Sequence, residues 1–249
     1  MKRGVMAVVL LAALPALAAP TAERAKGGDT IRVLVAPEEE SVLAAQMAGR
    51  IRQINADLGA HIRAGQPLLR FDCDEQDARL KMAQAEFYGA QQTYESKAKL
   101  QAMQSVSELE VEQAASAVEK FRAQIQLYQA QLRQCSVSAP FSGRVTKLRV
   151  KPYESVNVGQ PLVEVVNDRR LKAQLNIPST WLARVKTNTP FAVRIEETGN
   201  TYEARVRRIN GKVDAVSQSV EIEGEFRGTP ADLLPGMSGV ATFSDAPKR

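Results

Sequence analysis

Residues 48–68 read AGRIRQINADLGAHIRAGQPL, and residues 142–162 read SGRVTKLRVKPYESVNVGQPL. The two segments align without a gap at a constant offset of 94 positions, so they are two copies of one repeat. Each copy alternates apolar and polar residues in short runs that Gly or Pro interrupts, which is typical of half-buried strands joined by tight turns. Because neither copy can bury its apolar face alone, we expect both to form one small β-sandwich. The apolar residues expected in its shared core are Ile51, Ile54, Leu68, Val145, Leu148 and Leu162.

The chain between the two copies changes in composition and in apolar period. Residues 74–134 are rich in Ala, Gln, Glu, Lys and Leu and contain no Pro, which favours helix. Apolar residues recur there at alternating spacings of three and four, the pattern of a coiled-coil seam. The seam residues are Leu80, Ala83, Phe87, Ala90 and Tyr94, then Val111, Ala114, Val118, Phe121, Ile125, Tyr128 and Leu132.

The two seams fit an antiparallel hairpin, in which the numbers of facing residues have a nearly constant sum. The expected pairs sum to 211 or 212 and are Leu80 with Leu132, Ala83 with Tyr128, Phe87 with Ile125, Ala90 with Phe121 and Tyr94 with Val118. Ser107 followed by Glu110 is a capping box, which starts the second helix and places the turn near residues 104–106. At about 1.5 Å per residue, each arm is roughly 40 Å long.

The N-terminus has the features of a secretory signal. Lys2 and Arg3 precede an apolar run over residues 5–14 and an A-x-A site, which predicts cleavage after Ala18. The alternative is an uncleaved anchor, but this run is shorter than the roughly 20 residues that span a bilayer. We therefore expect residues 1–18 to be removed and the mature protein to reside in an envelope compartment.

Charge and residue usage argue against several classes of function. Removing the signal lowers the formal net charge from +5 to +3, with 31 basic and 28 acidic residues remaining. No run of five like charges occurs and the basic residues are not interleaved with aromatics, so we expect no nucleic-acid partner. The single histidine, His61, has no triad partners, and the methionines are scattered. We therefore expect no enzyme, no cofactor and no metal.

Cys73 and Cys135 lie immediately outside the two ends of the helical segment, so an antiparallel hairpin brings them together. In an exported chain, two cysteines in such positions are candidates for a disulfide. A bridge that closes a loop of about 60 residues stabilises by roughly 4 kcal/mol in the chain-entropy model. The alternative is two small, buried thiols at strand ends.

Residues 171–243 return to β patterning with turn signals between the strands. The expected strands are residues 171–177, 191–195, 202–209, 220–226 and 240–243. A short helix that Ser179 caps is expected to carry Trp181 into one end of a small barrel.

Together these segments resemble the membrane fusion proteins, also called periplasmic adaptors, and in particular the RND-type efflux adaptors. The motifs that carry the resemblance are AGRI (48–51) with GQPL (65–68), VSAPFSGRV (137–145) and LLPGM (233–237). The expected fold is of mixed α and β class, elongated and modular. It consists of a split lipoyl-like β-sandwich (31–73 and 136–168), an antiparallel α-helical coiled-coil hairpin that interrupts it (74–135), and a small β-barrel (169–245).

The resemblance implies a periplasmic adaptor subunit of a tripartite efflux or export pump. Such a subunit bridges an inner-membrane transporter, of RND or ABC type, and an outer-membrane channel. It also implies self-association, usually as a hexamer, and a periplasmic position peripheral to the inner membrane. Little chain remains for the membrane-proximal domain of many relatives, so we expect the barrel to meet the transporter directly or another subunit to fill the gap.

In many members of the family the hairpin tip carries an Arg, a Leu four residues later and a Ser seven residues beyond that Leu. Leu100 and Ser107 match this spacing, whereas Ser96, with Lys97 beside it, stands at the Arg position. The resemblance therefore implies that these residues dock onto the channel. The alternative is that Leu100 is an ordinary seam residue and Ser107 only a helix cap.

The sequence also bears on two functions other than that of an adaptor. A swinging-arm carrier would need a modified Lys in a Met-Lys-Met or Asp-Lys-Ala tripeptide, and neither occurs. A secreted lipoyl-like protein that binds a solute or metal would bind a stoichiometric ligand as a monomer, which calorimetry would detect.

Overall fold

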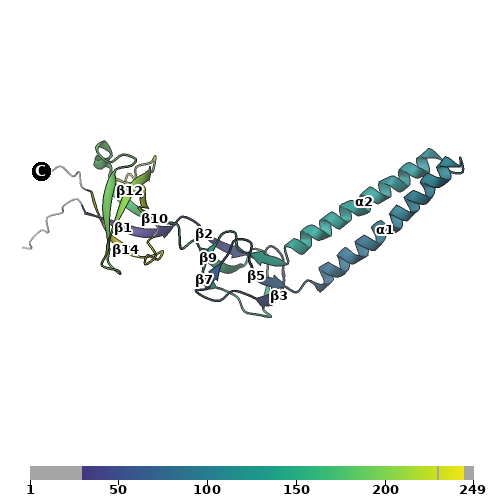
Figure 1. The fold of residues 1–249 in the computed structure, drawn as a ribbon, viewed down its shortest axis with the longest axis horizontal. Helices are drawn as coiled ribbons and strands as arrows, with labels where there is room; N and C mark the ends of the chain where they lie inside the picture. The colour runs from purple at the N-terminus through teal and green to yellow at the C-terminus, as the bar shows by residue number, and fades with distance from the viewer. Residues whose placement is uncertain (1–29, 229, 244–249) are drawn as a thin grey trace, which may run out of the picture.

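The computed structural model describes residues 30–228 and 230–243. Three parts follow one another along the molecule: a β-barrel at one end, a β-sandwich in the middle and two long helices at the other end (Figure 1). The predicted signal, residues 1–18, and the last two residues of the predicted barrel range, 244–245, lie outside the described residues. In the part that the structure describes, no helix is long and apolar enough to cross a lipid bilayer.

The two repeat copies interleave in a sandwich of two four-stranded sheets. The sheet orders are β2-β9-β7-β4 and β6-β5-β3-β8. Their strands are β2 (Glu40–Ala44), β3 (Gly49–Ile54), β4 (His61–Ile62), β5 (Pro67–Phe71), β6 (Ser136–Ser138), β7 (Gly143–Leu148), β8 (Ser155–Val156) and β9 (Pro161–Val166). The short strand of each copy crosses to the sheet of the other, because β4 pairs with β7 and β8 pairs with β3. Neither copy can therefore complete its sheet alone.

One hydrophobic core is shared by the two copies, and this prediction is confirmed. The predicted core residues that are fully buried come from both copies and are Ile51, Leu68, Val145 and Leu162. The other two, Ile54 and Leu148, pack against the edge of this core and are half-buried. Gly65 and Gly159 have φ angles of 78° and 82°, a backbone conformation that L-residues with a Cβ resist.

Gly143 and Gly49 occupy equivalent positions in the two copies but differ in the space around them. A Cβ on Gly143 would lie 2.0 Å from the carbonyl oxygen of Val166, whereas one on Gly49 would meet nothing closer than 3.6 Å. Because Gly143→Ala must push β7 away from β9, we expect it to lower the free energy of unfolding by about 2 kcal/mol. The matched variant Gly49→Ala should change it by less than about 1 kcal/mol. Urea denaturation of both variants measures the difference, and equal losses would contradict the expectation.

Two long helices connect β5 to β6. They are α1 (Asp74–Ala102) and α2 (Glu108–Arg133), with 29 and 26 residues. The helices run side by side in opposite directions and project away from the sandwich (Figure 1). Of the predicted seam residues, Ala83, Ala114 and Val118 are buried. The others are partly or largely exposed, because each helix has only one neighbour to pack against.

The remaining strands form a closed six-stranded barrel in the order β1-β10-β13-β12-β11-β14. They are β1 (Thr30–Pro37), β10 (Leu171–Pro178), β11 (Pro190–Ile195), β12 (Thr201–Ile209), β13 (Ser219–Phe226) and β14 (Ser238–Phe243). A short 3-10 helix, η1 (Ser179–Ala183), follows β10. Its Trp181 packs edge-on against Phe243, with ring centroids 5.8 Å apart, and so joins the barrel core.

Strand β1 belongs to the barrel, although the domain boundaries expected from the sequence place it in the sandwich. Residues 31–37 fall within the range 31–73 expected for the first sandwich half, and for these residues the expectation is wrong. β1 pairs with β10 on one side and β14 on the other, and its Val33 and Val35 are buried in the barrel core. Without β1, the facing edges of β10 and β14 would be left unpaired, so this strand closes the barrel.

Candidate functional site

The end of the helical pair that lies farthest from the sandwich holds all four predicted docking residues. We call residues 96–110 the helical tip: the last turns of α1, the connecting turn and the start of α2. Ser96, Lys97 and Leu100 lie on α1, and Ser107 is the N-cap of α2. The structure therefore gathers these residues at one end of the molecule.

The polar side chains of α1 at the tip are already engaged. Ser96 Oγ donates a hydrogen bond to the Gln92 carbonyl at 2.8 Å, inside its own helix. Lys97 Nζ lies 3.6 Å from Glu110 Oε2 and so links the two helices across the tip. Neither residue offers the free, forked donor that an Arg at this position would provide.

Backbone and cap interactions hold the turn of the tip in place. Ser107 Oγ accepts a hydrogen bond from the Glu110 N–H at 3.3 Å, which confirms the predicted N-cap. The Leu100 carbonyl accepts from the N–H groups of Met103 and Ser105, at 3.1 and 3.0 Å, and so satisfies an otherwise free carbonyl at the end of α1. The tip is therefore an ordered surface.

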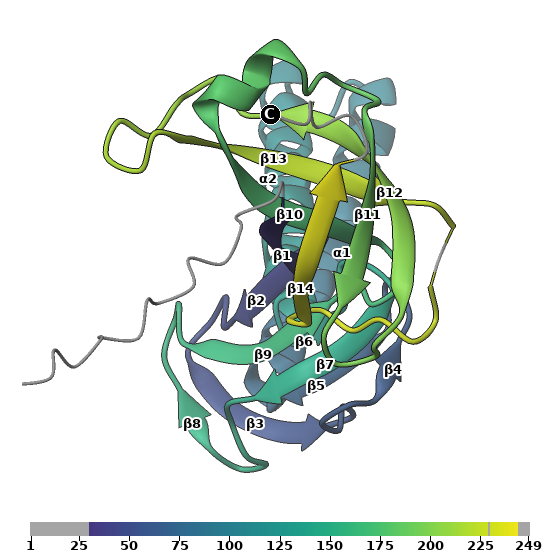
Figure 2. The same ribbon diagram turned by 90° about the vertical axis from the view of Figure 1, so that its left-hand side faces the viewer.

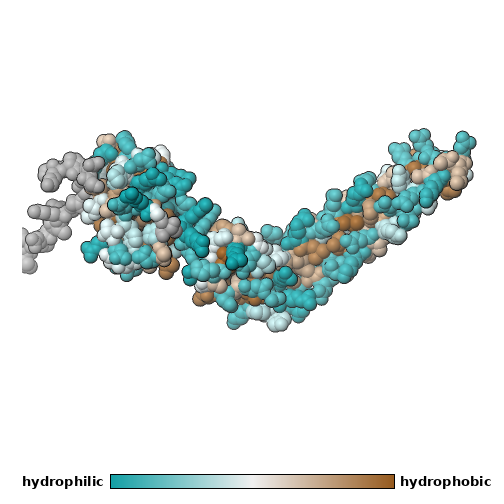
Figure 3. Space-filling model, viewed as in Figure 1, coloured by the Kyte–Doolittle hydropathy of each residue, from teal (hydrophilic) through white to brown (hydrophobic). Residues whose placement is uncertain are grey.

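Large apolar side chains are exposed at this ordered tip. Leu100 is 42% exposed, Met103 73% and Leu109 62%. Figure 3 shows apolar colouring along the junction of the two helices and again at the tip. Met103 and Leu109 were not among the predicted site residues, because they fall outside the three-and-four spacing of the seams. The sequence signal that could have identified them is that two large apolar residues flank the predicted N-cap, Ser107, at the turn.

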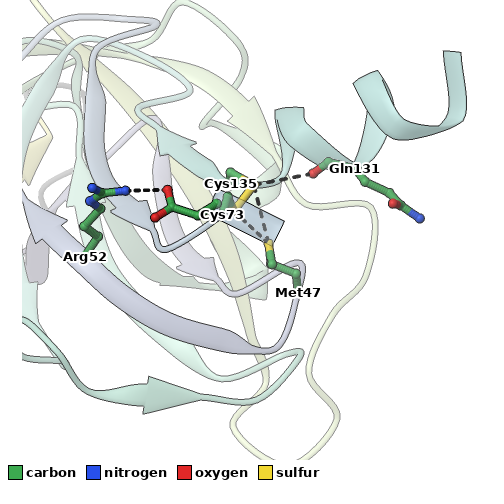
Figure 4. Close-up of a disulfide and its surroundings, with 6 residues drawn as sticks. Met47, Arg52, Cys73, Gln131 and Cys135 are labelled. Atoms are coloured by element: carbon green, nitrogen blue, oxygen red, sulfur yellow. Dashed lines mark hydrogen bonds and ion pairs between the residues drawn. A yellow bond between two sulfur atoms is a disulfide. The ribbon is translucent and has the colours of Figure 1, made fainter. Parts of the chain in front are cut away.

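The opposite end of the helical pair, which we call the base, is closed by a disulfide (Figure 4). Cys73 and Cys135 are bonded, with their Cα atoms 6.2 Å apart, and are separated by 62 positions in sequence. Met47 Sδ lies 3.9 and 4.0 Å from the two Sγ atoms and packs over the bridge. The bridge ties the first residue before α1 to the second residue after α2.

Two ion pairs also attach β3 to the chain around the start of α1, one to Asp72 just before the helix and one to Asp74, its first residue. Arg50 Nη2 donates to Asp72 Oδ2 at 2.7 Å, and Arg52 Nη1 donates to Asp74 Oδ1 at 2.8 Å. The hydrogen bond from Arg50 lowers the pKa of the Asp72 carboxyl, and the charges of Arg50 and Arg52 add to this effect against a smaller cost of burial. Asp74 also lies in the first helical turn, where a negative charge favours the helix dipole.

The lowered pKa of Asp72 predicts an acid-sensitive attachment of the helices. A carboxyl whose pKa is lower in the folded than in the unfolded state adds stability above its ordinary pKa of 3.8 and loses it as the pH falls through the folded value. We therefore expect Asp72→Asn to be less stable than the wild type at pH 7, with a difference that shrinks as the pH falls below the ordinary pKa of 3.8. Thermal unfolding across this range measures it. The control Asp57→Asn removes an exposed carboxyl of the sandwich and should leave the stability at pH 7 nearly unchanged.

The lone histidine belongs to an ion cluster at the edge of the sandwich. His61 Nε2 lies 2.9 Å from Arg144 Nη2, and Asp168 Oδ2 accepts from Arg144 Nε at 3.1 Å. These contacts fasten the end of β9 to β4 and β7. Among residues 30–228 and 230–243, no group of three or more His, Cys, Asp or Glu side chains could hold a metal ion.

Comparison with protein families gives a match over the sandwich and the helices. The family model described as RND MFP, barrel-sandwich hybrid domain, matches residues 39–168, just over half of the chain. An uncharacterized protein of Haemophilus influenzae is 26% identical over 82% of this chain and 54% of its own length. Multidrug resistance protein MexA of Pseudomonas aeruginosa is 26% identical over 77% and 54%, and nodulation protein NolF of Rhizobium meliloti is 24% identical over 84% and 63%. The chain thus spans about half to two thirds of the length of these relatives.

Solved structures share the fold. A MacA-MexA chimeric protein that contains the MexA alpha-hairpin domain has a TM-score of 0.79 at 19% identity, with 87% of this chain and 80% of that chain covered. The membrane fusion protein Spr0693 of Streptococcus pneumoniae has a TM-score of 0.74 at 16% identity, with 87% and 99% covered. The order of barrel, sandwich and helical pair is therefore shared with proteins of very different sequence.

Proposed function

The chain belongs to the RND-type membrane fusion protein family, and from this premise we propose that it is a periplasmic adaptor subunit of an efflux pump. In this role it bridges an inner-membrane transporter and an outer-membrane channel without catalysing a reaction. One observation carries the proposal: a long helical pair with an exposed apolar tip lies at one end, and a barrel lies at the other (Figure 1). A bridging protein needs two such separate contact surfaces.

In the proposed assembly, α1 and α2 act as a coiled-coil hairpin whose tip contacts the outer-membrane channel. The three-and-four spacing of the seams and the antiparallel course of the helices support this assignment. Because Ser96 and Lys97 are engaged within the helical pair, the contact relies on Leu100, Met103 and Ser107 rather than on an Arg. Apolar side chains at the centre of such a contact supply most of its affinity.

The base gives the proposed hairpin a fixed direction. The disulfide joins the residues that flank the two helix ends, and the pairs Arg50–Asp72 and Arg52–Asp74 attach β3 to the chain around the start of α1. An arm roughly 40 Å long amplifies small rotations at its origin, so a loose base would spread the tip over many positions. The base therefore reduces the entropy lost when the tip docks.

The barrel end is the proposed contact with the transporter, and the match to the RND MFP family model supports an RND-type transporter over an ABC-type one. Assembly around a conduit further requires self-association, and six copies are the proposed number. The proposed location is the periplasm, peripheral to the inner membrane, after removal of residues 1–18.

Crosslinking in cells tests the proposed function directly. A photoreactive amino acid is placed at Met103 on the tip, at exposed Leu234 on the barrel, or at exposed Leu58 on the sandwich as a control. We expect Met103 to capture an outer-membrane channel and Leu234 an inner-membrane transporter, whereas Leu58 captures neither. Capture of an ABC-type protein at Leu234 would correct the transporter class. Absence of both captures, together with a stoichiometric ligand in calorimetry, would instead support a solute-binding envelope protein.

A further inference from the structure

Three sulfur atoms from separate parts of the chain meet at the base of the helical pair (Figure 4). Met47 lies in the loop between β2 and β3, whereas Cys73 and Cys135 flank the two helices. Met47 Sδ is 3.9 Å from Cys73 Sγ and 4.0 Å from Cys135 Sγ. We call these three residues the sulfur triad. The sequence alone does not reveal it, because Met47 precedes Cys73 by 26 positions and matches no common metal-binding spacing.

The sandwich holds the triad in place and leaves it open to small molecules. Met47 and Cys73 pack against the edge of the sandwich core, and Cys135 is buried with 9% exposure. The Phe71 N–H donates to the Cys135 carbonyl at 2.9 Å and fixes the backbone on one side of the bridge. Figure 1 and Figure 2 both place the barrel at the other end of the sandwich, so it does not cover the triad. Because Met47 and Cys73 are only half-buried, an ion or a reductant can reach the sulfurs.

The spacing of the three sulfurs suits a single metal ion. At a metal–sulfur bond of about 2.3 Å, three sulfurs placed evenly around one ion lie about 4 Å from one another. Met47 Sδ already lies at this distance from both cysteine sulfurs. Only Cys73 Sγ and Cys135 Sγ must move apart, and reduction of the bridge frees the two side chains to do so by rotation between their rotamers.

The donor set of the triad selects the kind of ion. Two thiolates and a thioether are soft ligands, which favour Cu(I) over hard cations such as magnesium or calcium. Zinc also binds thiolates, but its structural sites take four protein ligands. Within residues 30–228 and 230–243, no further His, Cys, Asp or Glu side chain joins the two cysteines in a metal-binding group. The triad therefore fits Cu(I), an ion that three sulfurs can satisfy.

We propose that the sulfur triad binds one Cu(I) ion when its disulfide is reduced. A dithiol reductant gives two electrons and two protons to the bridge, becomes a disulfide itself, and leaves Cys73 and Cys135 as thiols. Cu(I) then displaces one proton from each thiol and also accepts a lone pair from the Met47 thioether. The metal neither gains nor loses an electron. The ion links the same two positions as the disulfide, so it closes the base of the helical pair in its place.

Titration of the reduced, full-length protein with Cu(I) under argon tests the proposal. A coloured Cu(I) chelator competes with the protein, and its absorbance reports how much metal the protein takes. We expect one Cu(I) per reduced chain and none in the oxidised wild type or in Cys73→Ser, Cys135→Ser.

Met47→Leu separates the triad from a site made of the two thiols alone, because it removes the thioether and keeps both cysteines. We expect it to bind Cu(I) about tenfold more weakly or less, since even outer-shell partners of a metal contribute about 10- to 100-fold. The matched control is Met82→Leu, which changes an exposed methionine on α1 and should bind as the wild type does.

Thermal unfolding asks whether the ion closes the base. Reduction should lower the unfolding midpoint of the wild type. Excess Cu(I) should raise it again, because a ligand that binds the folded chain more tightly than the unfolded chain stabilises the fold. Reduced Met47→Leu should recover less of the midpoint at the same concentration of Cu(I).

Three results would overturn the inference. They are no binding by the reduced wild type, equal affinity of Met47→Leu and the wild type, and equal uptake by Cys73→Ser, Cys135→Ser. None of these measurements involves a transporter or a channel, so such a failure leaves the proposed function standing. Failure of the captures at Met103 and Leu234 would likewise leave the triad standing.

Discussion

Replacing Leu100 by Lys and Ser107 by Asp in one chain is expected to abolish export while leaving the protein folded. The signs of the charges are chosen to suit the helix ends: Lys near the end of α1 favours the dipole, and Asp at the N-cap of α2 retains a side-chain acceptor. Two new charges buried against a channel cost about 2 to 5 kcal/mol, which weakens docking roughly 30-fold or more. The readout is growth on the compound to which a deletion strain is most sensitive, together with crosslinking at Met103.

The matched control is Met82→Lys, which adds a charge to an exposed apolar position of α1 far from the tip. We expect this variant to export normally. Both proteins are first compared in thermal unfolding and in periplasmic amount, so that a folding defect is separated from a docking defect. Normal export by the Leu100→Lys, Ser107→Asp protein would show that the tip does not dock through these residues.

Replacing both cysteines by Ser is expected to lower the free energy of unfolding by about 4 kcal/mol. The native bridge closes a loop of 62 positions, and releasing such a loop restores conformational entropy to the unfolded chain. The loss should fall on the sandwich and the base rather than on the helices, whose internal hydrogen bonds remain. Urea denaturation of Cys73→Ser, Cys135→Ser measures the stability, and limited proteolysis should find new cleavage near the base.

Met47→Leu is the control for this variant, because it keeps the bridge and nearly the same side-chain volume. We expect it to cost less than about 1.5 kcal/mol. Mass spectrometry should find no alkylatable thiol in the native wild type and two after reduction. If reduction leaves the unfolding curve of the wild type unchanged, the stabilising role of the bridge is wrong.

Features that repeat or recur in the sequence were predictable. The offset of 94 positions identified both sandwich halves and the buried residues Ile51, Leu68, Val145 and Leu162. The composition of residues 74–134 indicated the helices, and Ser107 with Glu110 indicated where the second one starts. These signals come either from residues that are close in sequence or from the similarity of one segment of the chain to another. Both kinds of signal can be found in a single sequence.

Features that depend on pairing between distant strands were not predictable. The alternation in β1 fits a sandwich strand as well as a barrel strand, and only its pairing with β10 and β14 decides between them. The pairing of β4 and β8 with strands of the other copy could not be predicted either. Each strand has only two residues, too few to show an alternating apolar pattern. At the tip, the exposure of Met103 follows from how the turn folds back, which apolar spacing does not describe.

The helical pair begins and ends at adjacent strands of the sandwich, so its length can vary independently of the sandwich. β5 and β6, which lead into and out of the helical pair, are neighbours in one sheet, with Leu69 opposite Val137. The segment between β5 and β6 therefore leaves the sandwich and re-enters it at the same place. Its length can change without altering the sandwich. Adding seven residues to each helix would move the tip outward by about 10 Å in unchanged register. In the proposed adaptor, the distance between the two contact surfaces could therefore change in steps of one heptad without any change to the sandwich or the barrel.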